Sequence, residues 1–197
     1  MNTELLAAAQ AYCTPFYTQP GRAYHNITHI QNMLSALEIR RGLTPALALA
    51  VWGHDLIYDP QRHDNEEQSA DVFDDWLAAA SAPSELRQEI RALILATRHT
   101  SPPSTRTEAL LIDADLSILG AAAPVFWQYE RAIRQEYSFV DWPAYRAGRA
   151  AVLQGFLSRE RIYSTPEFAG LETGARVNLG AALATLREAD TEDQHGA

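Results

Sequence analysis

A histidine and an aspartate stand side by side in the stretch VWGHDLIYD, residues 51–59, whose apolar spacing is typical of a buried helix. A helix would place Val51, His54 and Asp55 on one face, because they are separated by about one turn. An ionised aspartate taken out of water costs on the order of several kcal/mol unless it has a partner. The pair therefore predicts a positive charge beside it.

Further segments also bring metal-binding side chains to apolar stripes. His29 lies in YHNITHI, ahead of an apolar run, and His99 follows Leu95 by one helical turn. Asp115 has leucines one turn away on both sides, whereas Asp113 is expected to be solvated on the opposite face. Each group alone is commonly a hydrogen-bonded core residue, a cap or half of an ion pair. One divalent cation would satisfy all the inward-facing groups together, which favours a metal site.

The donor types restrict the choice of metal. Imidazole nitrogen and carboxylate oxygen suit a divalent Mn, Fe, Co, Ni, Zn or Mg ion, and the lack of thiolates argues against a structural zinc site. Two histidines and two aspartates would leave coordination positions for water and for a substrate oxygen. Such a centre is suited to activating water and to polarising a phosphoryl group.

The elements that must position these groups are all helices. Helical periods run through the chain, and alternating runs long enough for a sheet are missing, so we expect an all-α fold. Asn26 and Thr44 are suitable N-caps, and Gly42 is suited to end a helix. The predicted helices cover approximately residues 3–13, 26–41, 45–59, 65–79, 84–99, 105–119, 124–138, 142–159 and 166–188.

Composition sets the class of protein and of ligand. The 197 residues, 47% of them hydrophobic, are enough for one domain, which we expect over 1–188, with a polar, disordered tail over 189–197. The net charge is −9 and all 16 basic residues are arginines, which excludes a lysine nucleophile and disfavours nucleic-acid polymers and anionic membranes. The single Cys13 cannot form an intrachain disulfide. Without a leader or a long apolar run, the protein is expected to be soluble and cytoplasmic.

The order of a histidine, an adjacent His-Asp pair and a distant aspartate on an all-α chain resembles the HD superfamily of metal-dependent phosphohydrolases. The stretches YHNITHI, WGHDLIYD, DNEEQSA and RVNLGAAL are similar to a small single-domain branch of that superfamily, over nearly the whole chain. The resemblance implies a compact multi-helix bundle of the HD type. The metal ligands that it implies are His29, His54, Asp55 and Asp115, with His25 as the competing choice for the first.

The sequence departs from better-known branches at one position. Deoxynucleotidases and guanosine polyphosphate hydrolases of the superfamily have a glutamate where this chain has Tyr58, so their catalytic assignment does not transfer. Asp59 matches the acidic residue that follows in the polyphosphate hydrolases. The remaining candidates for orienting water or protonating a leaving group are His25, Glu66 or its neighbour Glu67, and His99. Glu66 could equally serve only to offset a helix dipole.

Arginines of the C-terminal half are candidates for holding a substrate phosphate, because guanidinium groups bind phosphate oxygens in a two-pronged manner. We favour Arg134 and its neighbour Tyr137, since nearby apolar residues indicate an inward-facing stripe. Arg149 and Tyr58 complete the predicted substrate contacts.

The expected activity is hydrolysis of a phosphate ester or anhydride in a small metabolite or nucleotide. One alternative is a di-iron oxygenase, which would need further metal ligands, with His99 among them. Another is a non-catalytic nucleotide-sensing module in which the metal is structural. A homo-oligomer is compatible with the composition of the chain.

Overall fold

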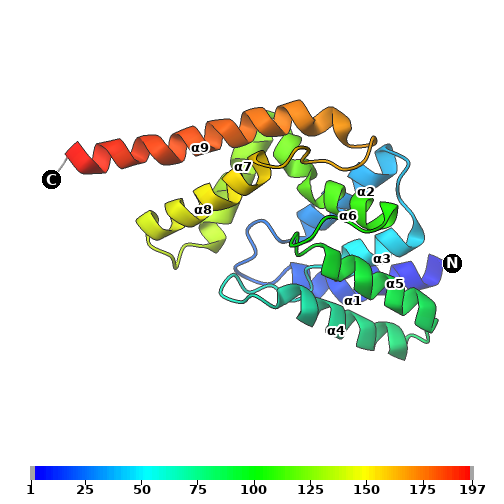
Figure 1. The fold of residues 1–197 in the computed structure, drawn as a ribbon. Coiled ribbons are helices and arrows are strands. Elements are labelled where there is room, and N and C mark those ends of the chain that lie inside the picture. The colour runs from blue at the N-terminus through cyan, green and yellow to red at the C-terminus, as the bar shows by residue number, and fades with distance from the viewer. Residues whose placement is uncertain (1–2, 196–197) are drawn as a thin grey trace. The chain divides into compact units, whose positions relative to one another are not determined.

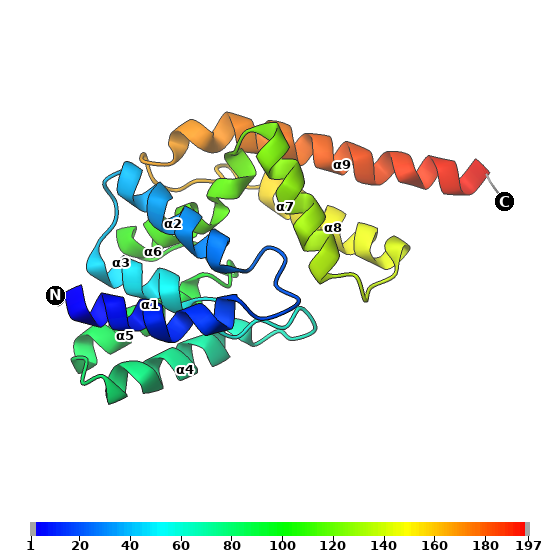
Figure 2. The same cartoon turned by 180° about the vertical axis from the view of Figure 1, so that it is seen from behind.

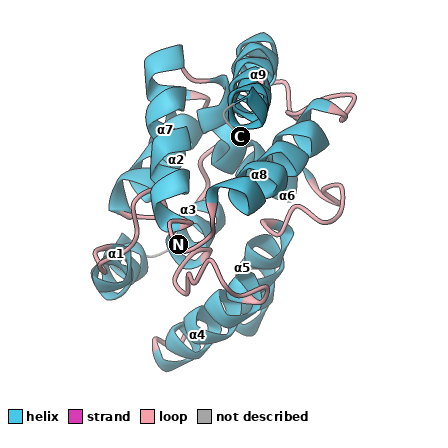
Figure 3. Ribbon diagram, turned by 90° about the vertical axis from the view of Figure 1, so that its left-hand side faces the viewer, coloured by secondary structure: helices cyan, strands magenta, loops and turns pink. Residues whose placement is uncertain are grey.

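The computed structural model describes residues 3–195, and helices are the only regular elements among them (Figure 3). The prediction of an all-α fold is confirmed. In chain order the elements are α1 (Thr3–Tyr17), α2 (Ile27–Ile39), α3 (Pro45–Gly53), α4 (Asn65–Ala79), α5 (Ser84–Ala96), α6 (Arg106–Asp115), the 3-10 turn η1 (Leu116–Gly120), α7 (Ala123–Glu136), α8 (Trp142–Leu157), the 3-10 turn η2 (Ala169–Leu171) and α9 (Glu172–His195).

The chain divides into two compact units, Met1–Asp115 and Leu116–Ala197. No glycine- or proline-rich linker marks this boundary in the sequence. The expectation of a single domain over 1–188 stays a prediction. Each unit is described separately below.

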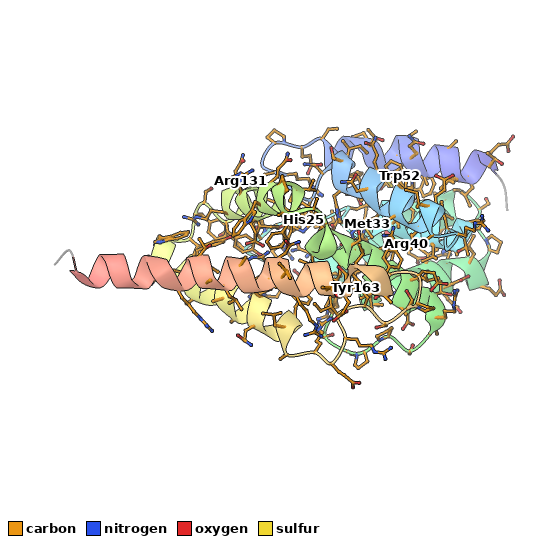
Figure 4. All side chains as sticks on the ribbon, turned by 90° about the horizontal axis from the view of Figure 1, so that it is seen from above. His25, Met33, Arg40, Trp52, Arg131 and Tyr163 are labelled. Atoms are coloured by element: carbon orange, nitrogen blue, oxygen red, sulfur yellow. The ribbon has the colours of Figure 1, made fainter. Side chains whose placement is uncertain are left out.

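In the first unit α3 is the central helix. It packs against α1, α2, α5 and α6, while α4 and α5 lie side by side (Figure 1). The sequence of α3, PALALAVWG, is apolar on every side, and a helix of this kind is stable only when neighbours cover it all round. Met33 of α2 and Trp52 of α3 are 1% and 4% exposed in this core (Figure 4).

Helix starts follow their predicted caps where a side chain supplies the hydrogen bond. The Asn26 side chain accepts a hydrogen bond from the backbone N–H of Thr28 at the start of α2. The Thr44 hydroxyl accepts one from the backbone N–H of Leu47 at the start of α3. These two predicted N-caps are confirmed, because each satisfies a backbone donor that the helix itself leaves open.

Several helix ends differ from the predictions, among them those of α1 and α5. The first helix continues through Pro15 to Tyr17, where we expected it to stop at 13. The helix expected to reach His99 ends at Ala96, and His99 adopts a left-handed backbone conformation with φ of 55°. Single residues with positive φ commonly follow a helix end, so the chain turns there and the imidazole leaves the helix axis.

In the second unit α8 packs along α9 (Figure 2). The buried Asn178 of α9 donates hydrogen bonds of 2.8 Å to the carbonyls of Leu119 and Ala121, and the Tyr163 hydroxyl donates one of 2.9 Å to the carbonyl of Leu116. These bonds satisfy backbone acceptors at η1 that a short 3-10 turn leaves unpaired.

The last helix is longer than expected. Its backbone is helical to His195, whereas the sequence predicted a disordered tail over 189–197. No glycine or proline occurs between Leu183 and His195, so no residue type in that stretch breaks a helix. Residues 196–197 lie outside the described residues.

Among the described residues no single helix is long and apolar enough to cross a membrane. The segments Arg106–Gly120 and Ala123–Glu136, which meet at a sharp bend, reach the required length and apolar composition only when they are counted together.

Candidate metal centre

Four side chains of the first unit bring their donor atoms together. Nε2 of His29 lies 3.3 Å from Nε2 of His54, 3.2 Å from Oδ1 of Asp115 and 3.7 Å from Oδ2 of Asp55. Nε2 of His54 lies 3.0 Å from the same oxygen of Asp55. His29, His54 and Asp55 form a group able to hold a metal ion, and Asp115 contacts it through His29.

The His-Asp pair lies in a turn and not within a helix. The prediction that this helix reaches residue 59 was wrong, because α3 ends at Gly53 and His54 is its C-cap. Carbonyls at the end of α3 are bonded by side chains instead of by a further helical turn. His54 Nδ1 donates to the carbonyl of Val51 at 2.9 Å, and the buried Tyr17 hydroxyl donates to that of Trp52 at 2.8 Å.

The bond to Val51 fixes which nitrogen of His54 is available to a ligand. A carbonyl can only accept a hydrogen bond, so Nδ1 of His54 must carry a proton. In the neutral ring Nε2 therefore presents a lone pair toward His29 and Asp55. In metal-binding histidines the ring nitrogen that does not bind the metal commonly donates a hydrogen bond to a backbone carbonyl, as Nδ1 of His54 does here.

Burial raises the free-energy cost of placing several acceptor atoms close together without a donor or a cation. His29 and His54 are 3% and 2% exposed, and the carboxylates of Asp55 and Asp115 are 13% and 18% exposed. The two carboxylates and Nε2 of neutral His54 are all acceptors, so acceptors outnumber donors in this buried cluster. The C-terminal end of α3 adds a partial negative charge at the same place. A proton or a metal cation bound among these groups would offset this excess of negative charge and acceptors.

The pKa values of the cluster respond to the same imbalance. Burial alone would lower the pKa of His54, but the charge and hydrogen bond of Asp55 raise it to about 9. Burial alone would raise the pKa of Asp55, but His54, with His25 and His29, holds it well below its ordinary range. Burial likewise opposes ionisation of Asp115, and hydrogen bonds from His29 and His99 lower its pKa further than burial raises it. The protein thus keeps both carboxylates ionised.

The donor spacing fits one small cation. Donor atoms about 2.1 Å from a common centre are about 3.0 Å apart at right angles and about 3.4 Å apart at the tetrahedral angle. Three of the four separations, at 3.0, 3.2 and 3.3 Å, fall in that interval, and the fourth is 3.7 Å. His29, His54 and Asp55 are therefore suitable ligands of one cation, and Asp115, which contacts His29, is the candidate for a fourth.

Side chains distant in sequence hold the segment that follows the pair. The hydroxyl of Ser69 accepts a hydrogen bond of 3.0 Å from the backbone N–H of Ile57. The amide of Asn65 bonds both the N–H and the carbonyl of Asp59, at 3.0 and 2.9 Å. The sequence did not identify these residues, nor Tyr17 and Arg22, as parts of the site. Asn65 and Ser69 lie within the motif DNEEQSA, and Tyr17 and Arg22 shortly precede YHNITHI. These positions were the only features of the sequence that could have pointed to them.

His99 lies beside the cluster. Its Nε2 is 3.0 Å from Oδ2 of Asp115, the oxygen that does not face His29. Its side chain is 20% exposed, so it is accessible from solvent while bonded to the buried carboxylate. The structure therefore brings this predicted residue to the site through Asp115.

His25 stands next to the cluster but does not occupy the first ligand position. Its ring stacks on that of Tyr58, with centroids 4.0 Å apart, and meets the ring of His29 edge-on at 6.0 Å. Nε2 of His29 is the nitrogen that faces His54 and Asp115. Of the two alternatives, His29 is the one positioned among the donors.

The acidic candidates near the pair have structural partners. The Asp59 carboxylate accepts a hydrogen bond of 2.9 Å from the backbone N–H of Gln61, closing a short turn. Glu66 lies in the first turn of α4, where a negative charge offsets the helix dipole. Its neighbour Glu67 forms an ion pair with Arg98, which immediately precedes His99. The catalytic roles proposed for Asp59 and Glu66 stay predictions.

Arg134, Tyr137 and Arg149 belong to the second unit and have partners within it. Arg134 donates a hydrogen bond of 2.7 Å to the carbonyl of Tyr137, which caps the end of α7. Arg149 is buried, forms an ion pair with Glu130 and donates a hydrogen bond of 2.8 Å to the hydroxyl of Tyr129. Both guanidinium groups thus serve local structure, and their roles as substrate contacts stay predictions.

One aspartate near the site is not where the sequence suggested. Asp113 is fully buried, so the prediction that it is solvated was wrong. The reason is that α6 is covered on all sides from Ala109 to Ala114, and its two faces do not divide into an inner and an outer one.

The arrangement offers imidazole and carboxylate donors that suit one divalent cation, with the partly exposed His25 and His99 next to it. Comparison with family models, with curated proteins and with solved structures finds no match. The geometry of these donors is therefore the evidence from which a function can be inferred.

Proposed function

We propose that this protein is a metal-dependent phosphohydrolase of the HD type. The observation that supports this is that donor atoms of His29, His54 and Asp55 lie at separations that suit a single cation, with an oxygen of Asp115 3.2 Å from Nε2 of His29. The motif order on an all-α chain resembles the HD superfamily and adds the reaction class. The proposed substrate is a phosphate ester or anhydride of a small metabolite or nucleotide, in keeping with a net charge of −9 that disfavours polyanions.

The chemistry supplied by a divalent cation bound here is activation of water near neutral pH and polarisation of a phosphoryl oxygen. The four ligands are held ready for it. Val51 fixes the tautomer of His54, and His99 orients Asp115 so that its other oxygen faces His29. Such preorganisation reduces the cost of assembling the centre when the ion binds.

His25 and His99 are the residues that we propose for proton transfer. His99 is partly exposed with its Nε2 bonded to Asp115, and His25 lies on the Tyr58 ring near Asp55. An imidazole can donate a proton to a leaving oxygen or accept one from water near neutral pH. The roles are separable by substituting each with glutamine and comparing the acidic and basic limbs of the pH-rate profile.

The test compares wild type with Asp55→Asn and with the surface control Asp71→Asn. Asp71 is 63% exposed and pairs with Arg91, so its loss removes one carboxylate of the same unit without touching the cluster. We expect wild type and the control to bind one Mn²⁺ per chain and to hydrolyse at least one member of a phosphorylated-metabolite and nucleotide panel. In Asp55→Asn both should fall by about 100-fold or more, because a ligand charge is lost.

Retained turnover in Asp55→Asn would contradict the proposal for the substrate tested. Two irons bridged by Asp55, with His99 as a ligand, would indicate an oxygenase instead. Tight nucleotide binding without turnover under several divalent metals would indicate a sensing module.

A further inference from the structure

Arg22 lies in the loop between α1 and α2 and reaches the backbone of the His-Asp turn. Its Nη1 donates hydrogen bonds to the carbonyl of Asp55 at 2.6 Å and to that of His25 at 3.1 Å. Its Nη2 donates to the carbonyl of Leu56 at 2.6 Å. One guanidinium group thus joins the peptide that carries a proposed metal ligand to the loop that carries His25.

Two aromatic rings place this guanidinium. Its central carbon lies 5.3 Å from the centroid of the Tyr17 ring and 5.8 Å from that of the Tyr58 ring, within the range of cation–π attraction. Tyr17 is 1% exposed and also bonds the carbonyl of Trp52 at the end of α3. The ring under Arg22 is therefore itself fixed to the helix that leads into the turn.

These contacts indicate what Arg22 does and what it does not do. The carbonyls of Asp55 and Leu56 follow a helix C-terminus, where backbone acceptors are in excess and a positive charge is favourable. Charge-assisted bonds to them are stronger than neutral ones and restrict the peptide that carries the carboxylate. Because both terminal nitrogens of Arg22 are directed at carbonyls, the group is suited to holding the chain and not to gripping a phosphate.

We propose that Arg22 is a positioning residue for the metal centre, setting the place of the Asp55 carboxylate and of the His25 ring by bridging their backbones. This inference rests on the proposed function for its link to metal binding. The planar fork is essential, since it reaches carbonyls of three residues at once. A lysine keeps the charge but carries it on a single nitrogen and cannot reproduce that pattern.

The matched control is Arg87, which makes a similar two-pronged contact elsewhere in the unit. Its Nε and Nη2 bond the two oxygens of Asp74 at 2.8 and 2.6 Å, between α5 and α4. Arg22→Lys and Arg87→Lys make the same chemical change in two partly buried guanidinium groups. A loss that came only from general destabilisation would appear in both variants.

Two measurements on the full chain test the proposal. Calorimetric titration with Mn²⁺ should give a Kd about 10- to 100-fold higher for Arg22→Lys than for wild type, and an unchanged Kd for Arg87→Lys. In the metal-free protein, amide hydrogen exchange at Ile57, whose N–H is bonded to Ser69, should be about tenfold faster or more in Arg22→Lys alone. Arg22→Gln should behave like Arg22→Lys and serves as the second variant if the lysine form does not fold.

The two readouts separate this inference from the proposed function. If wild type binds no Mn²⁺ but Arg22→Lys still accelerates exchange at Ile57, Arg22 positions the turn and the proposed function is wrong. If wild type binds Mn²⁺ and both Arg22 variants match it in Kd and in exchange, the inference is wrong and the proposed function is unaffected. Equal losses of affinity in Arg22→Lys and Arg87→Lys would also overturn the inference.

Discussion

Two imidazoles and two carboxylates of the first unit lie close together in a largely buried site. Each of His29 and His54 is almost fully buried, yet Nε2 of one lies 3.3 Å from Nε2 of the other. The bond to Val51 makes Nε2 of neutral His54 an acceptor, and the two carboxylates beside it are acceptors as well. This excess of acceptors in a buried site favours a proton or a metal cation there.

The buried thiol of Cys13 provides a test at the residue scale that does not involve the metal. Cys13 is fully buried in α1, and burial raises the pKa of its thiol to about 12. At pH 8 the folded protein therefore holds a protonated, inaccessible thiol, and we expect labelling by a thiol-reactive disulfide reagent only after unfolding in urea. Rapid, stoichiometric labelling of the native protein at pH 8 would contradict this.

The same shift predicts how Cys13 affects stability at high pH. An unfolded thiol ionises at about pH 8.5, whereas the folded one stays protonated until much higher pH. Between about pH 9 and pH 12 the unfolded state binds fewer protons than the folded state, so this group's contribution to stability falls as pH rises. The free energy of unfolding of wild type should thus decrease relative to that of Cys13→Ala over this interval.

At the scale of elements, sequence reasoning predicted that helices form and roughly where, but it did not predict where they end near the site. The cap at Asn26 was readable because donor and acceptor are two residues apart. The end of α3 at Gly53 was not, because the groups that bond its last carbonyls include Tyr17, 35 residues from Trp52. Contacts over that separation depend on how helices pack, which periodicity does not specify.

The close packing of Gly53 supplies a test at this scale. A Cβ on Gly53 would overlap the Phe73 ring, with Cε1 at 2.8 Å, and would lie 2.9 Å from Cδ1 of Ile94. Because neither neighbour has space to move in a packed core, we expect Gly53→Ala to lower the free energy of unfolding by about 1–3 kcal/mol. It should also weaken Mn²⁺ binding, since it displaces the residue before His54.

Gly148 is the control for that substitution. It lies within α8, and a Cβ there would meet nothing within 4 Å. Gly148→Ala should therefore be neutral or stabilise the protein by up to about 1 kcal/mol, because alanine favours the helix. Chemical denaturation of both variants gives the comparison, and a tolerated Gly53→Ala would mean that the core around α3 is looser than described.

Over the whole molecule, the sequence predicted the all-α class, which is confirmed. Through its resemblance to the HD superfamily it also predicted four metal ligands; three of them form a group able to hold a metal ion and the fourth, Asp115, contacts that group through His29, while metal binding stays a prediction. It did not predict the division at Asp115, because no glycine- or proline-rich linker marks it. Arg22 was not predicted either, since its role depends on carbonyls 33 and 34 residues away and not on a residue type in a pattern. The sequence allowed the candidate metal-binding side chains to be predicted. It did not allow prediction of the contacts that hold the backbone carrying them.

The central claim is that one cation is bound jointly by His29, His54, Asp55 and Asp115, and anomalous diffraction from crystals grown with Mn²⁺ tests it most directly. We predict a single anomalous peak within about 2.2 Å of Nε2 of both histidines and of a carboxylate oxygen of each aspartate. A Mn²⁺-saturated crystal with no peak at that position, or with ions held only by surface carboxylates, would contradict it.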